Sequence, residues 1–212
     1  MENLELVIGD KNISSWSLRS WLALKMTGAS FTERQVWLRR ENTKAEIVKW
    51  SPSGKVPLLR HGSVAIWESL AICEYLAELF PSARLWPESR KTRAVARAVS
   101  HEMHAGFTAL RQSLPMDIKG RHPTPALTPE LDRDISRITE IWTRCRGLHG
   151  AEGPFLFGTF TIADAMFAPV TTRFTTYGVA LDAVSADYVA AVAALPAMAE
   201  WTAAAADEVT PA

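Results

Sequence analysis

The pattern of apolar residues changes once along the chain, near residue 82. Before that point, short apolar runs such as residues 4–9 alternate with segments of helical spacing such as residues 16–26. Two further apolar runs, at 56–59 and 64–67, flank a turn that contains Gly62, which is typical of a β-hairpin. The order β-α-β-α-β-β-α predicts a small mixed sheet covered by helices.

After residue 82 every periodic segment has helical spacing. We expect one long helix over residues 93–114 and further helices in the rest of this half. The sequence thus predicts an α/β domain at residues 1–82, a proline-containing linker at 83–92 and an all-helical domain at 93–212. The remaining predicted helices cover residues 130–148, 161–177 and an alanine-rich stretch, 185–206, that Pro196 interrupts.

The composition of the chain limits which binding partners and which cellular location we expect. The chain has 23 Lys plus Arg against 23 Asp plus Glu, so its charge gives no reason to expect nucleic acid or an anionic membrane as partner. Two cysteines cannot build a disulfide framework, and no Cys-x-x-Cys pair is present for redox work or zinc. The acidic N-terminus lacks the features of a signal peptide, and the longest apolar stretch, 188–199, is too short to span a bilayer. We therefore expect a cytoplasmic protein.

A hydroxyl-rich loop precedes the first predicted helix. Ser14 and Ser15 stand where that helix begins, followed by Trp16. The unpaired amides and the dipole of a helix N-terminus favour an anion, and a hydroxyl there can donate to a thiolate and lower its pKa. Simple helix capping by serine is the alternative interpretation.

Two other segments contain groups that could bind an extended peptide. Lys55, Val56 and Pro57 begin a strand, and a proline there leaves an unpaired edge with which an extended peptide can pair. Glu68 and Ser69 stand at a strand-to-helix junction, where the carboxylate can accept an ammonium group and the helix start a carboxylate. For this pair too, a capped helix is the alternative.

Together these segments resemble one family. The serine loop, the Lys-Val-Pro-Leu segment and the Glu-Ser-Leu-Ala-Ile-Cys-Glu-Tyr-Leu segment at 68–76 look like the thioredoxin-like domain of cytosolic glutathione transferases. The loop at 14–19 is similar to that of the zeta class, and Thr161 with Asp164 resembles the family's helix-capping motif. The resemblance implies an α/β thioredoxin-like N-terminal domain followed by an all-α helical-bundle C-terminal domain.

The resemblance also implies roles for these residues. Ser14, with Ser15 as the alternative, would hold the sulfur of glutathione as a thiolate. The Val56 backbone would pair with the cysteinyl part before a cis Pro57, and Lys55 would lie near the glycyl end. The γ-glutamyl head group would bind Glu68 and Ser69. Homodimerisation is implied by the resemblance alone.

The second substrate would lie between the two domains, against the helix from residue 93. Trp16, Met103, His104 and Phe107 are candidates to line that pocket, although Met103 and Phe107 are equally suited to helix packing. His101 and His104 have no evident third metal ligand, so we expect no metal.

The predicted function is conjugation of glutathione to a hydrophobic electrophile. Trp16 replaces the cysteine of the zeta loop, which counts against zeta-type isomerisation of maleylacetoacetate. A glutathione-dependent isomerase or peroxidase and a glutathione-binding module without activity remain alternatives.

Overall fold

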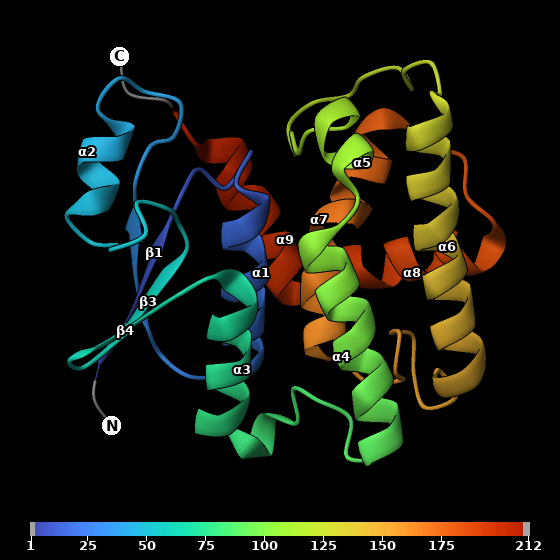
Figure 1. Ribbon diagram of the computed structural model, residues 1–212, viewed down its shortest axis with the longest axis horizontal. Coiled ribbons are helices and arrows are strands. Elements are labelled where there is room, and N and C mark those ends of the chain that lie inside the picture. Colours follow the sequence, from blue (N-terminus) through green and yellow to red (C-terminus); the bar gives the residue numbers. More distant parts are fainter. Residues whose placement is uncertain (1–2, 210–212) are drawn as a thin grey trace.

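The first part of the computed structural model, which describes residues 3–209, is a four-stranded mixed sheet (Figure 1). Its strands lie in the order β2-β1-β3-β4, with β1 and β2 parallel and the other neighbours antiparallel. This confirms the predicted order of strands and helices. The elements are β1 (Leu4–Ile8), α1 (Ser15–Met26), β2 (Thr32–Gln35), α2 (Thr43–Val48), β3 (Leu58–His61), β4 (Val64–Trp67) and α3 (Ser69–Leu79).

Both faces of the sheet are covered. Side chains alternate along a strand, so Leu6 and Ile8 of β1 pack into the large core with α1 and α3, while Val7 packs with Leu58 and Ile47 on the side of α2. Figure 1 shows α1 and α3 between the sheet and the helical half, with α2 on the far face. Burial on both faces explains the continuous apolar run at residues 6–8 within β1.

The second part is a bundle of helices. At its centre lies α7, in which nearly every residue is buried even though the helix contains Asp164, Arg173 and four threonines. The chain enters this bundle through a short 3-10 turn (Pro81–Ala83) and a connection in which Leu85 and Trp86 are buried. Its helices are α4 (Arg90–Ala105), α5 (Thr108–Ser113), α6 (Pro129–His149), α7 (Ile162–Tyr177), α8 (Ala183–Ala193) and α9 (Pro196–Asp207).

The prediction of one helix over residues 93–114 is wrong. The helix ends at Ala105, and α5 begins at Thr108 after Phe107, which has a φ of 62°. The side chain of Arg111 folds back and donates to the carbonyls of Gly106 at 3.0 Å and of Met103. These bonds satisfy acceptors that the break leaves without helical partners. The predicted domain boundaries remain predictions, and α4 begins at Arg90, inside the predicted linker.

Candidate functional site

The N-terminus of α1 presents two serines to a cavity. Ser14 is the N-cap residue and is buried; its hydroxyl donates to the hydroxyl of Ser17 at 2.8 Å. The Ser17 oxygen also accepts from the backbone amide of Gly9 at 3.0 Å, which holds it in place. Within residues 3–209, the hydroxyl of Ser15 makes no hydrogen bond. The start of α1 therefore carries an oriented pair of hydroxyls, Ser14 and Ser17, and a third hydroxyl, that of Ser15, which is unengaged in the same range.

The cavity beside these serines has a volume of about 430 Å³ and lies between the sheet and the helical half. Lys55 and Val56 form part of its wall, and the Val56–Pro57 peptide bond is cis, as the resemblance implies. Two segments far apart in the sequence thus meet at one cavity. Its lining residues are Ile13, Ser14, Ser15, Trp16, Leu38, Arg39, Ile47, Gly54, Lys55, Val56, Arg111, Pro115, Met116 and Arg173.

Glu68 and Ser69 are not in this wall. Glu68 is the N-cap residue of α3 with a φ of 70°, in the left-handed region that residues other than glycine seldom adopt. Its carboxylate lies 3.5 Å from Nε2 of His104, whose ring packs edge-on against Trp16 of the cavity wall. The hydroxyl of Ser69 is buried and has no hydrogen-bond partner among the residues that the structure describes. Glu68 is therefore connected to the cavity wall through His104 and Trp16.

Two arginines, one buried and one half-buried, contact the ring of Trp16. The guanidinium carbons of Arg19 and Arg111 lie 4.4 and 4.8 Å from the centre of its ring. Arg19 and Arg173 are buried, and in the described part of the chain two nitrogens of each, Nη1 and Nη2 of Arg19 and Nε and Nη1 of Arg173, have no partner. A buried guanidinium without acceptors is energetically costly. The arrangement is therefore suited to an anion.

Electrostatics agrees with that interpretation. Burial, together with repulsion from Arg111 and Arg173, lowers the pKa of Arg19 well below its usual value. Burial and the charge of Arg111 lower the pKa of Arg173 to about 10, so it stays charged at neutral pH. An anion in the cavity would relieve this repulsion.

Sequence reasoning found part of this wall. Trp16 is in the cavity wall and His104 packs against it. Met103 is fully buried and Phe107 is nearly so, both in the core rather than in the cavity wall. Sequence reasoning gave no role to Arg173. The signal that could have revealed it is a lone basic residue within the apolar segment 162–177.

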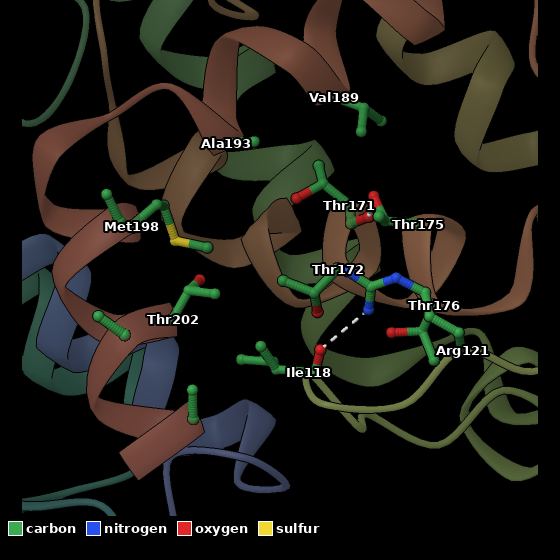
Figure 2. A pocket seen from close by; sticks show the side chains of 13 residues that line it. Ile118, Arg121, Thr171, Thr172, Thr175, Thr176, Val189, Ala193, Met198 and Thr202 are labelled. Atoms are coloured by element: carbon green, nitrogen blue, oxygen red, sulfur yellow. Dashed lines mark hydrogen bonds between the residues drawn. The ribbon is translucent and has the colours of Figure 1, made fainter.

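A second cavity, of about 520 Å³, lies between α7 and α9 and contains none of the predicted site residues (Figure 2). Four threonines of α7 line it, and the hydroxyl of each donates to a backbone carbonyl. Figure 2 also shows Arg121 bonded to the Ile118 carbonyl, at 3.2 Å. The polar groups of this wall are therefore largely engaged within the protein.

Comparison with known proteins places the chain in a family. A model described as the N-terminal domain of glutathione S-transferase matches residues 13–79, and one described as the C-terminal domain matches residues 125–204. A maleylacetoacetate isomerase of Rattus norvegicus is 33% identical over 160 residues, which is 73% of this chain and 70% of the relative. The chain belongs to the glutathione transferase family. This confirms the resemblance inferred from its motifs.

Other members of the family are similar to parts of this chain or to its whole fold. Glutathione S-transferase 1 of Dianthus caryophyllus is 39% identical over 85 residues, 40% of this chain and 38% of the relative. The chain spans less than half the length of several curated relatives that it matches. A glutathione transferase homologue from Burkholderia GL BGR1, crystallised with bound glutathione, has a TM-score of 0.75 at 24% identity over 98% of this chain and 100% of that one. This likeness confirms the thioredoxin-like and helical architecture.

Among residues 3–209 no single helix has the length and apolar character needed to cross a bilayer. Helices α8 and α9, which are bent relative to each other, together have sufficient length and apolar composition. The same residues contain no group of three His, Cys, Asp or Glu side chains placed to hold a metal ion.

Proposed function

We propose that the 430 Å³ cavity binds glutathione and that Ser14 keeps its sulfur ionised. The observation that carries this proposal is the meeting of the serines at the α1 N-terminus with Lys55 and Val56, before a cis proline, in one cavity. Glutathione bound in the crystal of the Burkholderia homologue supports it.

In this proposal the peptide lies along the start of β3. The Val56 backbone pairs with the cysteinyl residue, and the ammonium group of Lys55 neutralises the glycyl carboxylate. Glu68 accepts the γ-glutamyl ammonium. The buried hydroxyl of Ser69, which lacks a partner within residues 3–209, donates to the γ-glutamyl carboxylate.

Ser17 gives Ser14 an additional role. A hydroxyl hydrogen can rotate, so when a thiolate is present Ser14 can donate to the sulfur while Ser17 donates to Ser14. The Gly9 amide, bonded to the Ser17 oxygen, favours that direction. Successive donors polarise one another, and the dipole of α1 adds to the stabilisation of the anion.

Ser14→Ala should leave glutathione affinity nearly unchanged and lower kcat by about 10-fold or more, because the lost donor acts mainly on the ionised sulfur. The checks are isothermal titration with glutathione and steady-state kinetics. Ser15→Ala is the matched control, one residue away in the same wall. Full turnover in both variants would contradict activation by serine.

The arginines around Trp16 favour an electrophile that carries a carboxylate over a purely hydrophobic one. Arg111 and Arg173 are in the cavity wall, and Arg173 has donors to spare. The relatives named maleylacetoacetate isomerase support a glutathione-dependent isomerase as the second candidate. In that reaction the thiolate adds to a polarised carbon–carbon double bond, rotation follows, and elimination of the thiolate restores the double bond and the free sulfur. Kinetics with a maleyl diacid, chlorodinitrobenzene and an organic peroxide would separate isomerase, conjugation and peroxidase activity.

His104 predicts a pH dependence of glutathione binding. Burial and then the charge of Arg19 lower the pKa of His104 below 6.5, so at neutral pH it leaves the Glu68 carboxylate to the ligand. When the pH falls through that pKa, His104 becomes charged and competes for Glu68. We expect KM for glutathione to rise about threefold, the size of an exposed ion pair. The measurement is KM against pH. His104→Asn should abolish the rise, and His101→Asn, at an exposed neighbour, should retain it.

A binding module without activity is the remaining alternative. Retention on immobilised glutathione with no turnover of any substrate in the panel would favour it. Retention with turnover favours the enzyme.

We further propose that the protein is cytoplasmic and acts as a homodimer. Exposed apolar side chains of β4 and α4, Val64, Trp67 and Val95, support association of two copies. Sedimentation of the protein and of Trp67→Glu would test this, with a monomer expected for the variant.

A further inference from the structure

The loop that carries Ser14 is bonded to the C-terminal end of the chain. Glu208 follows α9, and its carboxylate accepts hydrogen bonds from the backbone amides of Lys11 and, at 3.0 Å, of Asn12. The indole of Trp201, within α9, donates to the Lys11 carbonyl at 2.9 Å. The peptide groups on both sides of Lys11 are thus held by one C-terminal segment.

A second segment of the helical half holds the same loop. The side-chain amide of Asn12 donates to Asp117 at 2.9 Å, and its oxygen accepts from the backbone amide of Lys119 at 2.9 Å. The Lys119 ammonium group donates to the backbone carbonyl of Glu208 at 2.7 Å. This bond ties the two holding segments to each other.

The loop transmits its position to Ser14 over a short distance. The amide of Ser14 donates to the Asp10 carbonyl at 2.8 Å, so residues 10–14 form a tight turn around Lys11 and Asn12. The Asp10 carboxylate in turn accepts from the Leu38 amide at 2.7 Å. A shift of the Lys11 and Asn12 amides therefore moves Ser14 relative to Ser17.

We propose that Glu208 is a positioning residue that sets the place of the Ser14 hydroxyl in the cavity. The inference rests on the proposed function of Ser14. Hydrogen bonds from amides to a carboxylate are strong, and here two consecutive backbone amides, those of Lys11 and Asn12, donate to the carboxylate of Glu208. The C-terminal segment of the helical half thereby controls the reactive edge of the thioredoxin-like half.

Glu208→Ala should lower kcat by about 10-fold, raise the pKa of the bound glutathione thiol by about one unit and change KM for glutathione less than twofold. The thiol pKa is measured from the ultraviolet absorbance of the thiolate during a pH titration. Loss of a negative charge alone would lower that pKa, so a rise identifies displacement of the serine. Glu208→Gln, which loses the charge and keeps an acceptor oxygen, should show a smaller rise.

A matched control and a ligand-free readout complete the test. Glu200→Gln changes an exposed carboxylate within α9 that, among residues 3–209, pairs with the half-buried Lys25, and should change none of these quantities. Amide hydrogen exchange at Lys11 and Asn12 should become faster in Glu208→Ala. Unchanged exchange, or an unchanged thiol pKa in Glu208→Ala with a raised one in Ser14→Ala, would overturn the inference. An unchanged thiol pKa in Ser14→Ala and Ser15→Ala would instead overturn the proposed function.

Discussion

Replacing Asp164 with alanine should lower the free energy of unfolding by about 4 kcal/mol. The carboxylate is fully buried at the start of α7 and accepts four hydrogen bonds. Two come from the amide and hydroxyl of Thr161, at 2.8 and 3.0 Å, and two from the Leu156 amide and the Tyr188 hydroxyl, both at 3.1 Å. Alanine would leave these buried donors without partners.

The charge state does not weaken this expectation. Burial raises the pKa of Asp164 to about 6, and the four donors oppose that shift, so the group is ionised at neutral pH. Urea unfolding at pH 7.5 or above, about a unit or more above that pKa, measures the effect on the ionised form.

The matched control is Asp182, the N-cap residue of α8. It accepts from the amide and hydroxyl of Ser185, at 3.0 and 2.6 Å, but lies at the surface. Asp182→Ala should cost about 1 kcal/mol, the usual value of an exposed cap. Equal losses at the two sites would mean that the buried network adds nothing to simple capping.

Replacing Arg173 with leucine should lower kcat/KM for a diacid electrophile by about 100-fold, since a bond from guanidinium to carboxylate is worth up to about 3 kcal/mol. A neutral electrophile such as chlorodinitrobenzene should lose less than about threefold. The reason is that Arg173 is in the cavity wall with two nitrogens unpartnered among the described residues, so these donors are available to a ligand.

Stability provides a second readout of the same change. A buried charge without a partner is unfavourable, so Arg173→Leu should unfold at the same urea concentration as the parent or a higher one. Arg173→Lys should retain part of the diacid activity, since it keeps the charge and loses the guanidinium geometry. Thr172→Ala, in the adjacent residue but facing the second cavity, is the control. Equal losses with neutral and acidic substrates would contradict an anion-binding role.

Local sequence patterns predicted much of the candidate site because each of its parts is a short motif of neighbouring residues. A serine at a helix start, a proline at a strand start and a glutamate before a helix are visible within a few residues of sequence. The structure has Ser14 as the N-cap residue of α1 and a cis bond before Pro57. The roles of these residues toward glutathione remain predictions.

The helical half was harder to predict for a physical reason. Apolar spacing continues through Gly106 and Phe107, so periodicity alone gives one helix. The break depends on Phe107 taking a left-handed conformation and on Arg111 satisfying the freed carbonyls, both of which are settled by packing. Met103 and Phe107, on either side of Ala105 where α4 ends, lie in the core instead of the cavity wall.

The sequence by itself determined the order of elements, the family and the identity of the hydroxyls at the first helix, because alternation, capping and turn chemistry act between near neighbours. Only the tertiary structure decided which distant side chains meet. Arg19, Arg111 and Arg173 come from three helices, and Glu208 reaches a loop near the opposite end of the chain. Such encounters depend on how helices pack against the sheet, which no local pattern records.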